Sequence, residues 1–242
     1  MSVLDRIERL RNVMEQQKID CYIIPTDDYH HSEYVGDYFK FREYITGFTG
    51  SAGTAVFTKD KAGLWTDGRY FIQAEAQLQG SGITLYKSGE PGVPTIEEFL
   101  KSELKEGDVL GFDGRTVTYA QGKRYCHIAD ENGASLQYRL DFAQNIWKER
   151  PEMSLEPVFS LADEYTGEKI GSKLERIREI MKENGCNAHV LSSLDDIAWL
   201  LNIRGNDIAY CPLVLSYAIV YNNSVELFAD IRKFSDDIVN SL

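Results

Sequence analysis

The sequence predicts an α/β fold made of two copies of one domain, the second of them incomplete. Two observations over its 242 residues carry this prediction. Amphipathic helical patterns alternate with short apolar runs, which is typical of layered α/β domains. Three blocks of sequence also recur in the same order in both halves of the chain, and such recurrence indicates an internal repeat.

The repeat follows one plan in both copies. An amphipathic helix leads into a short apolar run, a glycine-containing segment comes next, and a block that shares Leu, Asp, Arg and Phe comes last. Helical periodicity alone could imitate the first match, but three matches in one order make coincidence a poor explanation. The first block aligns IERLRNVM (7–14) with LERIREIM (174–181) and continues with DCYIIP (20–25) and NAHVLS (187–192). The second aligns YITGFTG (44–50) with WLLNIRG (199–205), and the third aligns LWTDGRYF (64–71) with LFADIRKF (227–234).

The first copy continues beyond its last block with alternating strands and helices. Proline and threonine stand just ahead of IEEFLKSEL, which is a typical helix start. The run VLGFDG is apolar enough for a buried strand. The predicted elements are strands at 52–57, 83–88, 109–114 and 136–140, and helices from residue 94 and over 119–131.

The repeat spacing also divides the chain into domains. We expect a first domain over 1–155 and a linker over 156–170, because the segment from Pro151 to Thr166 has two prolines and little periodicity. A second domain over 171–242 stops just after its own Asp–Arg block. Compared with the first copy it lacks about 75 residues. We therefore expect the chain to be a fragment of a longer protein.

Composition excludes several classes of partner. The formal charge of −12 argues against nucleic-acid and anionic-membrane surfaces, which need concentrated Lys and Arg. No apolar run reaches the length of a membrane span, and the amphipathic N-terminus lacks the apolar core of a signal peptide. We expect a cytoplasmic protein. The cysteines are too scattered for a zinc site or a disulfide framework; they are Cys21, Cys126, Cys186 and Cys211.

No catalytic or metal centre is predicted from the residues themselves. The sequence contains no HExxH and no Gly-x-Ser-x-Gly motif. The glycines of TGFTGSAGTAVF (46–57) lead into a strand rather than a helix, so they indicate tight turns and not a phosphate loop. The stretch TDDYHHSEY is rich in metal-binding residue types, but neighbours in one loop rarely converge on one ion, so we expect a solvated loop. The residues concerned are Asp27, Asp28, His30, His31 and Glu33.

The block LWTDGRYF raises a question about Arg69. Asp67 has the character of a helix N-cap, and we expect it to be a cap rather than a ligand. Arg69 would then lie in the first helical turn, where the helix dipole disfavours a cation. Arg69 could face a ligand, or it could form an ion pair that holds the strand–helix junction. Arg232 occupies the matching position of the second copy, which favours the ion pair.

Several of these segments together resemble the N-terminal part of the creatinase, prolidase and aminopeptidase P family. The resemblance covers essentially the whole chain, and the tandem copies are similar to the large, three-domain Xaa-Pro aminopeptidase branch. The segments that carry it are YIIPTDDYHHSEY (22–34), ITGFTGSAGTAVF (45–57), LWTDGRYF (64–71) and LDDIAWLLNIRGNDIAYCPLVLSYAIV (194–220).

The resemblance implies a fold, an activity and a role for one residue. It implies tandem domains with mixed β-sheets flanked by helices in a ribonuclease H-like motif, followed in the family by a pita-bread catalytic domain that is absent here. That domain binds two divalent ions, usually manganese, and removes an N-terminal residue that precedes proline. The N-terminal domains restrict access and build a homodimer, and an arginine corresponding to Arg69 contributes to binding of proline-containing peptides.

Two interpretations of the function remain. In the first, the chain is a non-catalytic part of a metallo-aminopeptidase and is inactive by itself, with no catalytic residue, metal ligand or cofactor of its own. In the second, it is a stand-alone peptide- or protein-binding module, because the same fold serves without catalysis in a histone-chaperone subunit. That subunit has one such domain and a long acidic tail, and neither feature matches this sequence.

Overall fold

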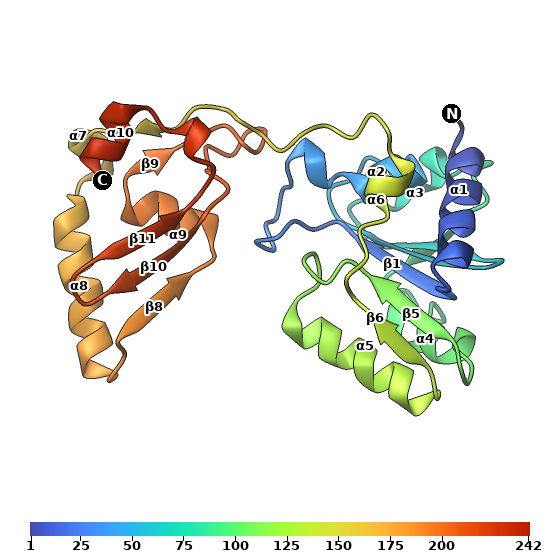
Figure 1. The fold of residues 1–242 in the computed structure, drawn as a ribbon. Coiled ribbons are helices and arrows are strands. Elements are labelled where there is room, and N and C mark those ends of the chain that lie inside the picture. Colours follow the sequence, from blue (N-terminus) through green and yellow to red (C-terminus); the bar gives the residue numbers. More distant parts are fainter. The chain divides into compact units, whose positions relative to one another are not determined.

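The computed structural model describes residues 1–242, apart from the side chain of Ser241. The chain divides into two compact units (Figure 1). Unit 1 comprises Met1–Glu33 and Tyr38–Pro151, and unit 2 comprises Tyr34–Asp37 and Glu152–Leu242. A short 3-10 helix, η1, spans Asp37–Phe39. In the described part of the chain no helix has the length and apolar character needed to cross a membrane.

Unit 1 is built on one mixed sheet of six strands in the order β4-β3-β2-β1-β5-β6. β2 is antiparallel to β1 and β3, whereas the pairs β3–β4, β1–β5 and β5–β6 are parallel. All strands except β2 therefore end at the same edge of the sheet. The strands are β1 (Cys21–Pro25), β2 (Thr54–Thr58), β3 (Ala62–Thr66), β4 (Thr84–Lys87), β5 (Val109–Phe112) and β6 (Ser135–Gln137).

Helices cover both faces of this sheet, as Figure 1 shows. The strands alternate apolar side chains between the faces, so that Tyr22 and Phe57 meet α1, α2 and α6 while Ile23 and Val56 meet α4 and α5. The predicted helix start is confirmed, since the Thr95 hydroxyl accepts from Glu98 N in a capping box. The helices are α1 (Val3–Gln16), α2 (Phe41–Thr46), α3 (Phe71–Gln77), α4 (Ile96–Glu103), α5 (Tyr119–Glu131) and α6 (Ala143–Ile146).

Unit 2 contains a smaller sheet of three antiparallel strands in the order β11-β10-β8. α8 and α9 pack on one face and bury the core of the unit, which includes Leu200, Ala218 and Val220. The short strands β7 and β9 pair separately. The elements are β7 (Phe159–Ser160), α7 (Asp163–Thr166), α8 (Ile170–Glu183), β8 (Ala188–Leu191), α9 (Leu194–Leu200), β9 (Ile203–Arg204), β10 (Tyr217–Tyr221), β11 (Val225–Phe228), η2 (Ile231–Lys233) and α10 (Asp236–Ser241).

The internal repeat is confirmed at the level of strand register. In unit 1 Ala55 pairs with Leu64, and in unit 2 Ala218 pairs with Leu227. Both pairs lie between the second and third strands of the repeat. The first strand is antiparallel to the second in both units. The two units therefore share one topology over these blocks.

The repeat extends to individual hydrogen bonds. Arg11 of α1 donates through Nε to the carbonyl of Thr58 at 3.1 Å, and Arg178 of α8 donates through Nε to the carbonyl of Tyr221 at 2.9 Å. In each case the arginine of the first helix caps the end of the second strand. A tie of this kind between helix and strand in both units is strong support for a common fold.

A second contact also recurs in both units. Arg6 donates to the carbonyl of Tyr44, with its guanidinium 4.3 Å from the ring of the same residue. Lys173 donates to the carbonyl of Trp199 at 2.6 Å, with its ammonium 4.7 Å from that ring. The cation and the aromatic residue differ between the copies, but the geometry is the same.

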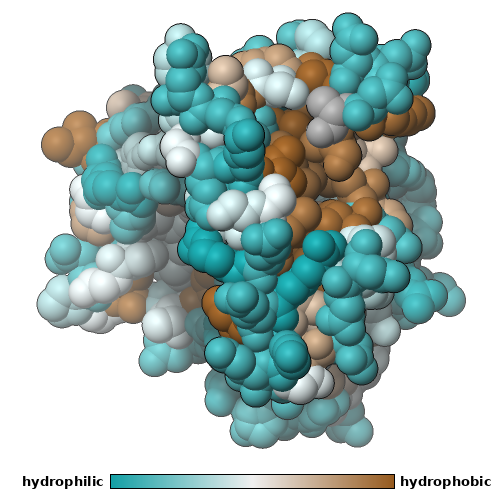
Figure 2. All heavy atoms as spheres, turned by 90° about the vertical axis from the view of Figure 1, so that its left-hand side faces the viewer, coloured by the Kyte–Doolittle hydropathy of each residue, from teal (hydrophilic) through white to brown (hydrophobic). Residues whose placement is uncertain are grey.

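The two units differ in how the second face of the sheet is covered. Ile23 and Trp65 of unit 1 are 1% and 4% exposed beneath α4 and α5, whereas Val190 and Phe228 at the same strand positions of unit 2 are 66% and 50% exposed. Among the described residues no helix equivalent to α4 or α5 covers this face of unit 2. Figure 2 shows a patch of apolar side chains among hydrophilic ones.

Candidate functional site

An open groove of about 580 Å³ lies at the edge of unit 1 where β1 and β3 end. Open α/β sheets commonly bind ligands at the carboxyl ends of their strands. The groove is bounded by the loop after β1, the loop before β2 and the turn after β3. Its lining residues are Pro25, Thr26, Asp27, His31, Ser32, Glu33, Ser51, Ala52, Gly53, Thr54, Trp65, Thr66, Asp67, Ser88, Ile96 and Gln121.

The loop after β1 is held by two buried carboxylates. Asp27 accepts from the backbone N–H of Asp28 at 2.9 Å, and its other oxygen lies 2.6 Å from His31 Nδ1. Burial raises the pKa of Asp27, and the His31 hydrogen bond opposes that shift. Asp28 is 1% exposed and accepts from the backbone N–H groups of His30 at 2.8 Å and Ser32 at 3.0 Å. These bonds organise the loop from inside.

The expectation of a solvated loop at TDDYHHSEY was wrong for its aspartates, since Asp27 and Asp28 are both buried. The sequence gives no direct signal of this burial, because one oxygen of each aspartate accepts from backbone N–H groups that come close only once the loop has folded. Among the residues that the structure describes, no group of three or more His, Cys, Asp or Glu side chains could hold a metal ion.

Arg42 of α2 is buried beneath the groove and connects two of the segments that line it. Its buried guanidinium donates through Nε to the Thr26 hydroxyl at 2.9 Å and also donates to the carbonyls of Phe48 and Gly50. Thr26 in turn donates to the Gly53 carbonyl through its backbone N–H at 2.8 Å and its hydroxyl at 2.9 Å. Desolvation lowers the pKa of Arg42 to about 10. The arginine thus joins the end of β1 to the loop before β2.

Asp67 and Arg69 form a local ion pair, and the predicted helix cap at Asp67 was wrong. α3 begins at Phe71, and its N-cap residue, Tyr70, makes no side-chain capping bond. Asp67 instead accepts from the backbone N–H of Arg69 at 3.1 Å and from Nε and a terminal nitrogen of its guanidinium, both at 2.9 Å. Arg69 therefore precedes the helix, and the argument from the helix dipole does not apply to it.

The same arrangement occurs at two further positions. Arg232 binds Asp230 through its backbone N–H and guanidinium, and Arg115 binds Asp113 in the same way. The alignment of the two internal copies identified Arg232 as the counterpart of Arg69 but did not point to Arg115. The signal was present, because the tripeptide Asp-Gly-Arg occurs at 67–69 and again at 113–115.

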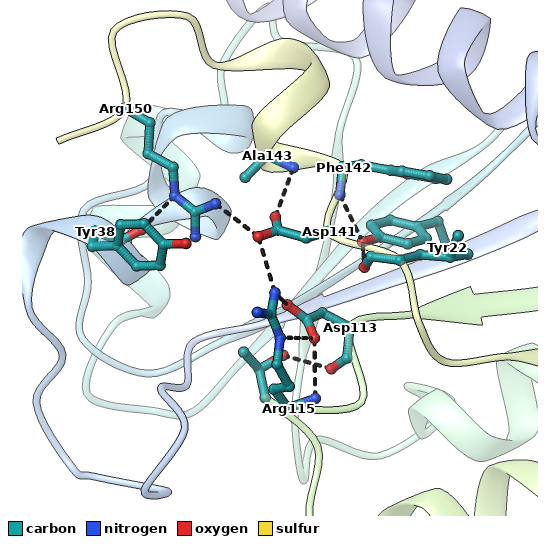
Figure 3. A network of polar contacts seen from close by, with 10 residues as sticks. Tyr22, Tyr38, Asp113, Arg115, Asp141, Phe142, Ala143 and Arg150 are labelled. Atoms are coloured by element: carbon teal, nitrogen blue, oxygen red, sulfur yellow. Dashed lines mark hydrogen bonds and ion pairs between the residues drawn. The ribbon is translucent and has the colours of Figure 1, made fainter. Parts of the chain in front are cut away.

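Arg115 differs from the other two because it joins a larger network, shown in Figure 3. Asp141 accepts from Arg115 at 3.1 Å and from Arg150 at 2.9 Å through the same oxygen. Arg150 also donates to the carbonyl of Tyr38 at 2.9 Å, and its guanidinium lies 3.6 Å from that ring. The network ties the last residues of unit 1 to the turn after β5 and to the segment before α2.

Family models for the creatinase/prolidase N-terminal domain match this chain twice, over residues 6–137 and 149–242. The chain belongs to the creatinase/prolidase N-terminal domain family. This confirms the resemblance that the motifs carried, and the mixed six-stranded sheet flanked by helices agrees with the predicted fold class.

Relatives of this family are similar along the whole chain. Xaa-Pro aminopeptidase 1 of Dictyostelium discoideum is 38% identical over 100% of the chain and 40% of its own length. Aminopeptidase P1 of Arabidopsis thaliana is 38% identical over 96% of the chain and 36% of its own length. The crystal structure of X-prolyl aminopeptidase from Caenorhabditis elegans matches this chain with a TM-score of 0.93 at 35% sequence identity. The match covers 100% of this chain and 41% of the Caenorhabditis elegans chain, which is described as a cytosolic enzyme with a di-nuclear active site. The chain thus spans about 40% of the length of these relatives.

Proposed function

We propose that this chain is the non-catalytic N-terminal part of a metal-dependent Xaa-Pro aminopeptidase, which removes the first residue of a peptide when the second is proline. The observation that carries the proposal is the similarity of the entire chain to X-prolyl aminopeptidase from Caenorhabditis elegans. The di-nuclear site described for that enzyme supports two divalent ions in the complete protein, which we propose to be manganese. The described residues of this chain offer no ligand set for them.

The proposed task of this part is to control substrate access and to assemble a homodimer in the cytoplasm. Proline-containing peptides are its proposed partners, and the acidic charge disfavours nucleic acid and anionic membranes. Hydrolysis of Ala-Pro-Pro by the full-length gene product, lost on chelation and restored by Mn²⁺, is the expected result. Equal hydrolysis of Ala-Ala-Pro would contradict the proposal, because the activity would then not depend on proline at the second position.

The proposed domain organisation is a first domain over 1–155, a linker over 156–170 and a partial second domain over 171–242. The three-stranded sheet of unit 2 supports the partial copy, since it reproduces the register of β1, β2 and β3 and leaves bare the face that α4 and α5 cover in unit 1. The short elements β7 and α7 lie within the proposed linker.

Arg69 is the residue that we propose to contact the peptide. Its side chain is 63% exposed, and because Asp67 binds Nε and one terminal nitrogen, the guanidinium is fixed while donors remain for a ligand. Arg232 is a matched control, since it makes the same ion pair in unit 2.

Arg69→Ala is expected to lower kcat/KM for peptide by about 10- to 100-fold, because a charge-assisted hydrogen bond to substrate is lost. Arg232→Ala is expected to leave kcat/KM unchanged. Both variants are measured with Ala-Pro-Pro and by thermal unfolding. If both variants lose stability to the same extent and neither changes the kinetics, Arg69 stabilises the junction between β3 and α3 and does not contact the peptide.

A further inference from the structure

The groove of unit 1 contains an aspartate–histidine pair that the proposed roles of Arg69 and the missing catalytic residues do not use. Asp27 is buried and lies 2.6 Å from His31 Nδ1, whereas the His31 side chain is 65% exposed and lines the groove. A carboxylate at Nδ1 holds the proton on that nitrogen. Nε2 is therefore left as the polar atom that neutral His31 offers to a ligand, and it is an acceptor.

His31 is held in place before any ligand binds. Its φ of +57° lies in the left-handed region, which is uncommon for a residue other than glycine and costs conformational energy. Asp28 compensates by accepting from the backbone N–H groups on either side of it, those of His30 and Ser32. The ring orientation is thus fixed by Asp27 and the backbone by Asp28, so that a ligand meets a preorganised acceptor.

The lining of the groove indicates the chemistry of its ligand. Pro25 and Ile96, which are partly exposed, supply apolar contact area, and Ser51 supplies a hydroxyl. The charged groups in the lining are three carboxylates, those of Asp27, Glu33 and Asp67, beside His31, and the lining contains no lysine or arginine. Arg69, next to the rim, is bound to Asp67.

An anionic ligand such as a phosphate would meet net negative charge in this groove, in a chain whose formal charge is −12. A ligand that offers N–H donors and has apolar side chains fits the lining better. The polypeptide main chain in extended form meets both requirements, since N–H groups and side chains alternate along it.

We propose that this groove binds an extended peptide segment, with His31 Nε2 accepting a main-chain N–H of the peptide. The proposal rests on the proposed function, because it assigns to the groove the part of an Xaa-Pro substrate that lies beyond its third residue. A tripeptide ends before that part begins, so the groove contributes to the binding of long peptides only.

The test uses the full-length gene product and two probes. An N-acetylated nine-residue peptide that begins Ala-Pro-Pro reports binding by calorimetry without being cleaved, and Ala-Pro-Pro reports hydrolysis. His31→Gly removes the imidazole, and glycine adopts a positive φ without strain. His31→Asn also tolerates this φ and keeps the test decisive if the glycine variant is unstable. His127→Ala is the matched control, since His127 is also exposed and pairs with a carboxylate, Glu131, at 3.1 Å, but does not line the groove.

Both His31 variants are expected to weaken binding of the nine-residue peptide by about 3- to 10-fold, as for the loss of one hydrogen bond, and to leave kcat/KM for Ala-Pro-Pro unchanged. His127→Ala is expected to change neither value. Unchanged binding in the His31 variants, or no binding by the wild-type protein, would overturn the inference. An equal loss on both probes would also overturn it, by placing His31 at the reacting end. Failure of the wild-type protein to hydrolyse Ala-Pro-Pro would refute the proposed function, while the calorimetry would still decide what the groove binds.

Discussion

Arg115→Ala tests whether burial, and not the local ion pair, decides what the Asp-x-Arg turns contribute to stability. Arg115 bonds Asp113 at 3.0 and 2.7 Å and Asp141 at 3.1 Å, and these carboxylates are only 15% and 11% exposed. Removing the guanidinium leaves both with fewer partners, although Asp141 keeps Arg150. Charged hydrogen bonds contribute about 1.5–3 kcal/mol, and because half of the Arg115 side chain faces solvent we expect a loss of about 1–2 kcal/mol.

Differential scanning calorimetry is the assay, because we expect the two compact units to unfold in separate transitions. A loss of this size lowers the midpoint by roughly 2–8 °C in a protein of this length, and the change is expected in the transition of unit 1 alone. Arg69→Ala and Arg232→Ala remove the same local pair at exposed positions and are expected to leave the midpoints unchanged. Equal shifts in all three variants, or none in Arg115→Ala, would refute the reasoning.

Two further predictions concern the core and the pH dependence of unit 1. Gly50→Ala is expected to lower the free energy of unfolding in urea by about 1–3 kcal/mol, since a Cβ there would lie 2.2 Å from the ring of Phe48. Gly122→Ala in α5 has open space around the new Cβ and is expected to raise the free energy of unfolding by about 0.5–1 kcal/mol. Burial raises the pKa of Tyr125 to about 12. The contribution of the protonated phenol to the free energy of unfolding is therefore fully present below about pH 10, where Tyr125 is protonated in the folded and the unfolded chain, and is lost as the pH rises through 12. Tyr125→Phe is expected to remove this loss, and parallel unfolding curves of wild type and variant from pH 9 to 12 would contradict the assignment.

The order of helices and strands could be predicted because it depends on local signals. The helix over Tyr119–Glu131 has the predicted bounds, since periodicity and a capping threonine define both its pattern and its start. The repeat could be found because the same buried positions recur in both copies. The pairing of Ala218 with Leu227, as of Ala55 with Leu64, then follows from the shared topology.

The groove could not be predicted in the same way, because its contacts join segments far apart in the chain. Arg42 meets Thr26 and the Gly50 carbonyl only when α2 packs behind the sheet. The error at Asp67 has a local cause. An aspartate before a helix is equally suited to accept from the residue two positions ahead, and the guanidinium of Arg69 favoured that alternative.

The central claim is that this chain supports an Xaa-Pro aminopeptidase without containing its catalytic centre. The most direct measurement compares release of alanine from Ala-Pro-Pro by the 242-residue chain and by the full-length gene product, each with added Mn²⁺. We predict release by the full-length product and none by the chain alone, because the described residues hold no ligand set that would activate a metal-bound water. Metal-dependent release of alanine by the 242-residue chain alone would contradict the claim.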